Sequence, residues 1–303
     1  MANFPIAAGH PDLSGNYIPN LFAKKLLIEF YKSTVFGAIA NTDYQGTISN
    51  MGDKVTIRTL PSITINTYTK GMDLTYEKLT PSTVDLLIDK GRYWAFPTND
   101  VDLKQADIAF VDKWARHAAE TLKVNIDNGI LADIYTDVSA SNKGETAGVV
   151  SSGYDIDAVS VNVTDKPNVL MNSMVDCGSI LDEQNVPESG RWFVLSARAA
   201  NFLKKSELRD ASISGDGTSM LRNGRLGMID RFTVYQSNNV YNDGTVDYLM
   251  FGHPTSLTFA SQMTKVETLR NQKDFGDLVR GLQVYGYKVV KPEAIGYLTT
   301  TYA

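Results

Sequence analysis

One stretch of the chain decides the fold: residues 99–135, which read NDVDLKQADIAFVDKWARHAAETLKVNIDNGILADIY. Apolar side chains recur there every three or four positions, as one buried helical face requires, at Ile108, Val111, Ala115, Ala118, Leu122 and Ile126. A charged stripe lies opposite and contains pairs of opposite sign four residues apart: Lys113, Arg116, Glu120, Lys123 and Asp127. At about 1.5 Å per residue the stretch predicts one rod of roughly 50 Å, which suits a flat domain better than a compact globule.

The composition is that of an ordinary globular protein. The chain has 303 residues, of which 43% are hydrophobic and 21% charged, so about two domains are expected. The net charge of -5 argues against bulk attraction to nucleic acid, and the single cysteine, Cys177, excludes a disulfide framework and a multi-cysteine metal site. Apolar runs are too short to span a membrane and the start lacks a signal-peptide pattern, so folding in a cytoplasm is expected.

The region before the long helix has strand character. Residues 1–18 predict an extended arm and helical periodicity begins at Pro19. Between residues 39 and 96, apolar and polar side chains alternate around 55–57, 63–65 and 84–88, which predicts a long β-hairpin with its tip near 70–73. A two-stranded ribbon with so few large apolar side chains near its tip cannot bury much against itself. We therefore expect it to project and to lie on a second copy of the protein.

The remainder of the chain mixes helices and strands. Helices are predicted at 168–181 and 197–208, and a loose glycine-bearing segment at 213–227. Predicted strands follow the order 159–163, 192–195, 232–235, 248–251, 264–269, 283–290 and 295–300. The fold class is therefore α+β.

Four pieces of the sequence, in this order, carry a resemblance. They are residues 52–58 leading into 83–95, the long helix, residues 192–196 with 227–239, and residues 266–291 with GLQVYGY at 281–287. Together they resemble the major capsid proteins of tailed double-stranded-DNA bacteriophages, which share the Hong Kong (HK-ninety-seven) capsid fold. No single piece is specific, whereas their joint order and spacing is.

The resemblance implies a part for each region. It implies an N-terminal arm and first helix at 1–38, an extended β-hairpin loop at 39–97, a peripheral domain with a spine helix at 98–164 plus 253–303, and an axial domain at 165–252. It also implies hexamers and pentamers that form an icosahedral head around double-stranded DNA, without sequence-specific binding and without a membrane. The virion is then the final location and the host cytoplasm the place of assembly. A portal and a separate scaffolding protein are implied partners, and a decoration protein is left open.

Side chains that could carry chemistry are sparse. Of the three histidines, His117 is read as a surface residue of the charged stripe, and the glycines from Gly215 to Gly227 lack the lysine of a phosphate loop. Asp100 and Asp102 stand at the start of the long helix, where the helix dipole favours them. We therefore predict no catalytic, metal-binding or cofactor-binding residue, and no enzyme.

The predicted functional residues are instead subunit contacts. They are Lys70, Met72, Asp73, Glu77, Trp94, Arg198, Arg222 and Arg225. The last three lie within 191–231, which contains eight basic and four acidic residues. This region is a solvated face or a match for the acidic stretch at 85–112 of a neighbour, and direct contact with packaged DNA is the least favoured of the three readings. Trp94 is either a core residue, as expected for Trp114 and Trp192, or an interface anchor. Two rival functions stay open: an encapsulin-like nanocompartment shell that loads protein, and a soluble hydrolase with an unrecognised site.

Overall fold

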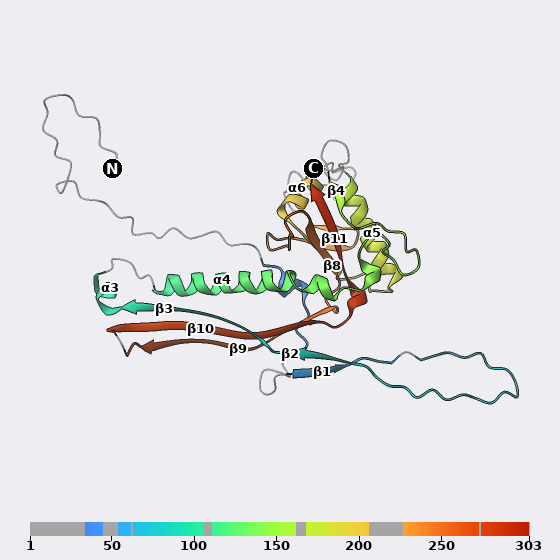
Figure 1. Cartoon of the computed structure of the whole chain (residues 1–303), viewed down its shortest axis with the longest axis horizontal. Helices are drawn as coiled ribbons and strands as arrows, with labels where there is room; N and C mark the ends of the chain where they lie inside the picture. Colours follow the sequence, from blue (N-terminus) through green and yellow to red (C-terminus); the bar gives the residue numbers. More distant parts are fainter. Residues whose placement is uncertain are drawn as a thin grey trace, which may run out of the picture.

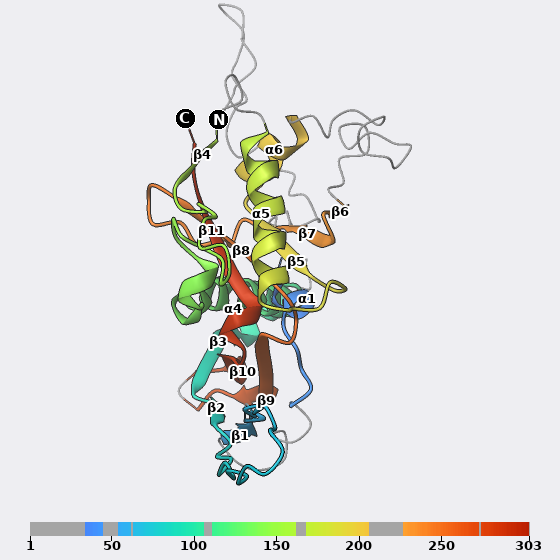
Figure 2. The same ribbon diagram turned by 90° about the vertical axis from the view of Figure 1, so that its right-hand side faces the viewer.

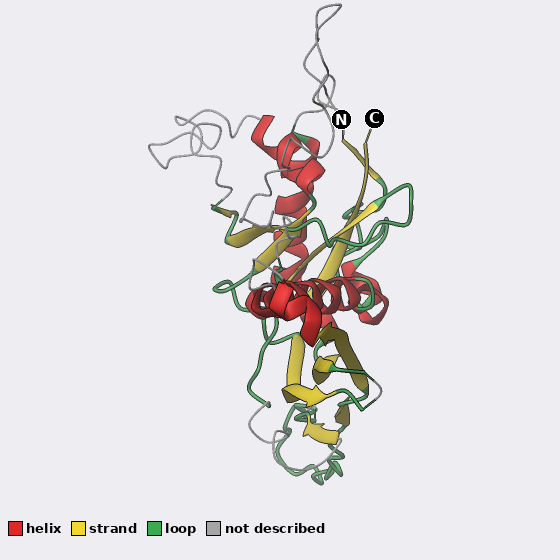
Figure 3. Cartoon of the chain, turned by 90° about the vertical axis from the view of Figure 1, so that its left-hand side faces the viewer, coloured by secondary structure: helices red, strands yellow, loops and turns green. Residues whose placement is uncertain are grey.

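The computed structural model describes residues 34–44, 54–61, 63–105, 111–161, 168–205, 227–272 and 274–302. Within these residues the molecule is elongated (Figure 1). The helix α4 (Val111–Leu131) runs along a three-stranded sheet of β3 (Lys90–Asn99), β10 (Gly276–Val289) and β9 (Leu257–Arg270), in that order. A six-stranded unit stands on the other side of α4, so that the helix lies between the two sheets (Figure 3).

The long helix differs in detail from its prediction. It is described as α3 (Asp100–Gln105) and α4, while residues 106–110, with Ile108, lie outside the described part. The α-helix ends at Leu131 and the 3-10 helix η1 (Ile134–Asp137) follows, because the last turn packs its apolar residues into the core. Among the described residues of the predicted apolar face, only Ile126 is fully buried, whereas Val111 and Leu122 are half-buried. The helix therefore contributes to the core mainly through its C-terminal end.

The six-stranded sheet has the order β4-β11-β8-β5-β7-β6. These strands are β4 (Val159–Val161), β11 (Ile295–Tyr302), β8 (Asp247–Gly252), β5 (Trp192–Leu195), β7 (Phe232–Gln236) and β6 (Met228–Ile229). All four residues of β5 are buried, as the apolar run predicts. Phe193 and Leu195 pack with α5 (Val169–Glu183) and α6 (Ala197–Lys205), while Trp192 and Val194 pack with the end of α4. Trp192 is thus the core residue that was expected.

Short elements join these units. The helix α1 (Phe36–Ile39) packs beside α4, while most of the helix predicted from Pro19 lies outside the described residues. The 3-10 helices η2 (Ala140–Asn142) and η4 (Pro292–Ala294) lie against each other through Asn142, whose Nδ2 donates to the carbonyl oxygen of Glu293 at 2.7 Å. No helix in the described part of the chain has the length and apolar character needed to cross a membrane.

The ribbon before the helix projects from the molecule. Strands β1 (Lys54–Arg58) and β2 (Thr83–Leu87) pair antiparallel, and residues 59–82 between them form an extended loop that reaches away from both sheets (Figure 1). The strand predicted at 63–65 is wrong: the described residues there adopt no strand and pair with no strand in the described part of the chain. The root of the ribbon packs on the three-stranded sheet through Ile57, Leu86, Ile88, Ala260 and Val284.

The strand pairing shows to which sheet two regions of the expected domains contribute. Residues 90–97, assigned above to the extended loop, pair with β10 in the three-stranded sheet. The strand β11, assigned above to the peripheral domain, pairs with β8 and β4 in the six-stranded sheet. The C-terminal strands β9 and β10 form the three-stranded sheet together with β3, and this sheet runs beside α4 (Figure 1).

Candidate assembly surfaces

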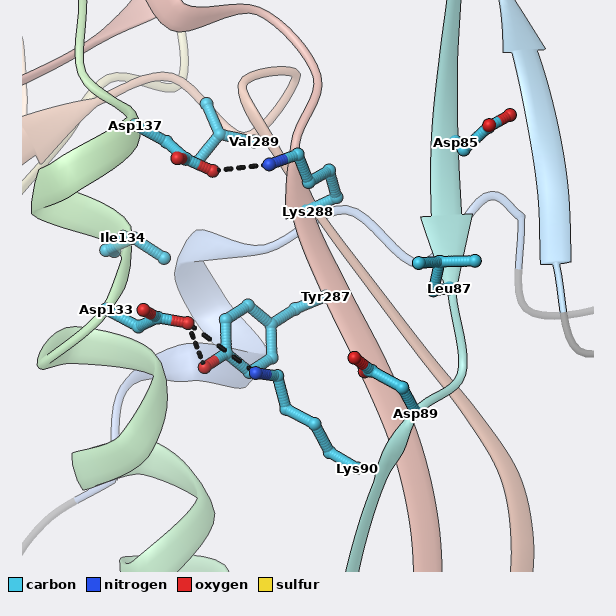
Figure 4. Close-up of a pocket in the computed structure, with 10 residues that line it drawn as sticks. All are labelled: Asp85, Leu87, Asp89, Lys90, Asp133, Ile134, Asp137, Tyr287, Lys288 and Val289. Atoms are coloured by element: carbon cyan, nitrogen blue, oxygen red, sulfur yellow. Dashed lines mark hydrogen bonds and ion pairs between the residues drawn. The ribbon is translucent and has the colours of Figure 1, made fainter.

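The root of the extended loop is tied to the end of the long helix. Figure 4 shows Tyr287 of β10, Asp133 at the end of α4 and Lys90 at the start of β3 converging on one cavity of about 230 Å³. The Tyr287 hydroxyl donates to Asp133 Oδ2 at 2.8 Å. Lys90 Nζ lies 3.6 Å from the same oxygen and 4.7 Å from the Tyr287 ring centroid, while Lys288 binds Asp137 at 2.7 Å. The direction in which the loop leaves the subunit is therefore held by polar contacts as well as by packing.

The contacts at the root of the loop shift the pKa values of Tyr287 and Asp85. Burial, and then the hydrogen bond to Asp133, raise the pKa of Tyr287, so that this phenol stays protonated well into the alkaline range. On β2, hydrogen bonds from Lys54 and Thr56 lower the pKa of Asp85 and keep its carboxylate charged. The root is thus a set of paired charges at neutral pH.

Two glycines of β10 let neighbouring groups lie close to its backbone near this root. A Cβ atom on Gly286 would lie 1.9 Å from the carbonyl oxygen of Leu87, where β2 crosses β10. A Cβ atom on Gly281 would lie 2.5 Å from the ring of Trp94. No side chain can be added at either position without moving the backbone or the indole ring.

Trp94 packs within its own subunit. Its ring stacks on Phe96 at a centroid distance of 5.5 Å, and Phe96 meets Trp114 of α4 edge-on at 5.7 Å. Trp94 is half-buried, whereas Trp114 is 45% exposed and so does not lie in the core as expected. The packing accounts for Trp94 without a neighbour, and its role as an interface anchor stays a prediction.

The extended loop exposes apolar side chains that nothing in the described chain covers. Ile65 is 90% exposed, Tyr76 91% and Leu74 59%. The predicted contact residues of the loop tip lie together there: Lys70 and Asp73 are exposed, the sulfur of Met72 accepts a hydrogen bond from the Thr69 amide at 3.1 Å, and the Glu77 carboxylate accepts one from the Thr64 amide at 3.2 Å. Exposed apolar side chains gathered on one projecting segment are typical of an interaction surface.

The basic region at 191–231 is partly neutralised inside the subunit. Arg191 is fully buried and donates to Asp182 Oδ1 at 2.6 Å, and Arg231 donates to the other oxygen of Asp182 at 2.8 Å. Burial opposes ionisation of Asp182, but the two guanidinium groups outweigh it and lower the pKa of this carboxyl. These two arginines therefore do not form part of a free basic patch. Sequence patterns gave no sign that Asp182 would pair with both.

Of the other predicted basic contacts, Arg198 alone falls within the described residues. Arg198 is exposed on α6, and its guanidinium carbon lies 4.4 Å from the centre of the Tyr302 ring. Arg222 and Arg225 lie outside the described residues. The structure therefore brings the loop residues together and places Arg198 apart from them.

The prediction that Asp127 belongs to the exposed charged stripe is wrong. It was expected on the exposed face, paired with Lys123, yet it is fully buried. Its carboxylate accepts hydrogen bonds from the amides of Val35 at 3.0 Å and Phe36 at 2.9 Å, and from the side chain of Asn239 at 2.7 Å. Lys123 instead pairs with Glu120 at 2.8 Å. Asp127 thus joins the start of α1, the long helix and the six-stranded unit, and no local pattern could have revealed this.

The titratable side chains that the sequence singles out lie in different surroundings. They contain no group of three or more His, Cys, Asp or Glu side chains that could hold a metal ion. Cys177 is fully buried, which raises the pKa of its thiol, and His117 is exposed on α4. At the start of α3, Asp100 pairs with Arg270, with Oδ1 3.0 Å from Nη1. The surfaces that stand out are therefore those for contact.

A comparison with protein families identifies the function of this protein. A family model described as phage capsid protein matches residues 58–298, which is more than half of the chain. The chain belongs to the phage capsid protein family. It is a major capsid protein with the tailed-phage capsid fold, and copies of it form the icosahedral head shell of the virion. The spine-like helix, the projecting ribbon and the two sheets are parts of a shell subunit.

Solved phage structures are similar to nearly the whole chain. One from Mycobacterium phage Che8 is 28% identical, covers 95% of this chain and 97% of that chain, and has a TM-score of 0.77. One from Cyanophage P-SCSP1u is 15% identical, with coverage of 95% and 94% and a TM-score of 0.74. One from Myoviridae phage XM1 is 14% identical, with coverage of 96% and 99% and a TM-score of 0.65. No protein with a curated description matches the sequence.

Proposed function

We propose that this capsid protein builds its shell from hexamers and pentamers, each held by extended loops that lie across neighbouring subunits. One observation carries the proposal: the loop at 59–82 exposes a row of large apolar side chains, including Ile65 and Tyr76, that the described part of its own subunit leaves uncovered. Burying such side chains contributes about 25 cal/mol per Å² of apolar surface, so a neighbour that covers them stabilises the assembly.

The proposal extends to the parts of the subunit and to its surroundings. The three-stranded sheet with α4 forms the peripheral domain, the six-stranded unit the axial domain, and residues 1–38 the N-terminal arm. Assembly takes place in the host cytoplasm with a portal and a separate scaffolding protein, around DNA that is held without sequence readout. The subunit is structural and catalyses no reaction. Its net charge of -5 agrees with a shell that does not grip DNA.

Sedimentation and electron microscopy of the purified protein test the proposal. Closed shells, or rings of five and six subunits, are the expected products. A monodisperse monomer at high concentration, in the presence of a scaffolding partner, would overturn it. Particles made during infection should be tested for their contents. DNA inside them would identify a shell that encloses a genome, whereas a protein cargo without DNA would identify a nanocompartment shell.

A further inference from the structure

Four tyrosine side chains gather where the six-stranded unit meets the end of α4, and they are here called the tyrosine cluster. Tyr135 lies on η1, Tyr241 on the connection between β7 and β8, Tyr248 on β8 and Tyr297 on β11. Both strands stand over the C-terminal end of α4 (Figure 2). Tyr297 follows Ile295 by two positions, so it shares the face of the sheet that packs with α4. The cluster therefore joins parts of the chain that are far apart in the sequence.

One pair in the tyrosine cluster is stacked. The ring centroids of Tyr135 and Tyr241 lie 5.0 Å apart, and the two ring planes differ by 10°. Tyr248 lies at 4.9 and 5.2 Å from these rings but is tilted by 47° to the first and 53° to the second. Tyr297 meets the Tyr135 ring edge-on, at 86°. Near-parallel rings at such a separation are offset-stacked, so carbon atoms of one ring lie against those of the other.

A hydrogen bond aligns the hydroxyl ends of this pair. The hydrogen bond with Tyr241, and then burial, raise the pKa of Tyr135, so this phenol stays protonated at neutral pH. Because the two hydroxyl groups are bonded and the two rings are parallel, the Cε carbons next to the hydroxyls also face one another. These are the carbon atoms at which a phenoxyl radical carries much of its unpaired electron.

The tyrosine cluster is also accessible to small solutes. All four of its side chains are half-buried. By contrast, Tyr285 in the core is 2% exposed, and Tyr76 on the extended loop is 91% exposed. A small oxidant can therefore reach the stacked pair, which already has its coupling partner in place within one chain.

The geometry points to a modification site: we propose that a one-electron oxidant couples Tyr135 and Tyr241 into a dityrosine within the subunit. Each phenol gives one electron to the oxidant and one proton to water. The two phenoxyl radicals then join through a new Cε–Cε bond, and the hydrogen atoms on these two carbons move to the oxygens and restore both hydroxyl groups. The chain thus loses two hydrogen atoms, and two equivalents of the oxidant are reduced.

The link fixes the six-stranded unit on the end of α4. Tyr135 follows that helix end, whereas Tyr241 belongs to the six-stranded unit. A covalent link between distant positions restrains the unfolded chain and thereby stabilises the folded one. This property goes beyond the proposed assembly, because it acts inside each subunit and needs no second copy.

Photo-oxidation of the full-length purified chain tests the site. A ruthenium(II) tris-bipyridyl complex with persulfate serves as the one-electron oxidant, and the dose is set by oxidation of the exposed Tyr76, read by mass spectrometry. From the subunit-sized band of a denaturing gel we expect a peptide pair joined at Tyr135 and Tyr241. It should be about tenfold or more as abundant as any other tyrosine pair within the subunit, because the two rings are held in contact.

Phenylalanine variants provide the controls, since they keep each ring and its packing. Tyr241→Phe should abolish the link, whereas Tyr297→Phe, in the same cluster, should retain it. The linked wild-type chain should melt about 5 °C or more above the unlinked chain, and oxidised Tyr241→Phe should show no such rise. Oxidation of Tyr76 without a link between Tyr135 and Tyr241, or a link that persists in Tyr241→Phe, would overturn the proposal.

Discussion

The six-stranded unit and the extended loop use the same kind of side chain in opposite ways. In the six-stranded unit Phe193, Phe232 and Phe251 are fully buried, and their ring centroids lie 5.6 to 6.3 Å apart. In the loop, Ile65 and Tyr76 are about nine-tenths exposed at 90% and 91%. The first region completes its core within one chain, whereas the second has apolar surface that the described part of its own subunit leaves uncovered. Folding and assembly are thereby assigned to different parts of one sequence.

Deleting residues 60–80 is the strongest way to break this comparison. A short Gly-Ser linker would replace them between β1 and β2. The remaining chain should keep its secondary structure and a cooperative thermal transition, because the loop buries almost nothing within the subunit. Shell formation should be abolished in sedimentation and electron microscopy. Intact particles from this variant would contradict the assignment of the loop to assembly.

A pair of truncations measures the same contrast in free energy. Phe251→Ala should lower the free energy of unfolding by about 3–5 kcal/mol, because it leaves a cavity in a packed aromatic cluster. Ile65→Ala should change it by less than about 0.5 kcal/mol while reducing shell yield. Denaturant unfolding of the subunit, in the loop-deleted background for Phe251→Ala, gives the first number. If Ile65→Ala destabilises the isolated subunit as strongly as Phe251→Ala does, the loop and the core do not differ in their contribution to folding.

Sequence reasoning succeeds where the pattern is local. The apolar run of β5 predicts a buried strand, and the alternation around 55–57 and 84–88 predicts a paired ribbon; both are present. The long helical pattern is also followed by helix over Val111–Leu131. It does not predict where the α-helix ends, because Ile134 is drawn into the core by tertiary packing and the chain tightens into η1.

Sequence patterns do not predict contacts between distant parts of the chain. Asp127 fits the exposed stripe by spacing, and only the fold brings the amide of Val35 and the side chain of Asn239 to it. The strand expected at 63–65 has suitable residues but pairs with no strand among the residues that the structure describes, so β propensity alone does not form it. The cavity lined by Tyr93, Lys265 and Arg280 likewise joins side chains from three strands and has no signature in any one of them.

Asp127 provides a test of intermediate size on the folding side of the comparison. Asp127→Ala should lower the free energy of unfolding by about 2–3 kcal/mol, because it leaves buried amide donors without an acceptor. Asp112→Ala, an exposed change on the same helix, should shift it by less than about 0.5 kcal/mol. Denaturant midpoints in the loop-deleted background give both values. Equal effects would mean that the buried carboxylate is no more important than a surface one.

The smallest expected effects compare two tyrosine–carboxylate pairs. The Tyr302 hydroxyl donates to Asp247 at 2.7 Å inside the six-stranded unit, and Tyr287 makes the corresponding bond to Asp133 at the loop root. Tyr302→Phe and Tyr287→Phe should each cost about 1 kcal/mol in subunit stability. Of the two variants, Tyr287→Phe alone should also increase hydrogen exchange in β2, because the Tyr287 bond lies at the loop root and the Tyr302 bond does not.

Their pH dependence sharpens this last contrast. Burial raises the pKa of Tyr302 to about 12, above the ordinary tyrosine value of 10.0. The folded state therefore favours the protonated phenol, so its contribution is complete below about pH 10 and is lost as the pH rises toward 12. Tyr302→Phe should flatten the fall in stability across that window, measured as denaturant midpoints at several alkaline pH values. If the fall is unchanged, other groups must cause it, and the Tyr302 hydrogen bond serves position rather than acidity.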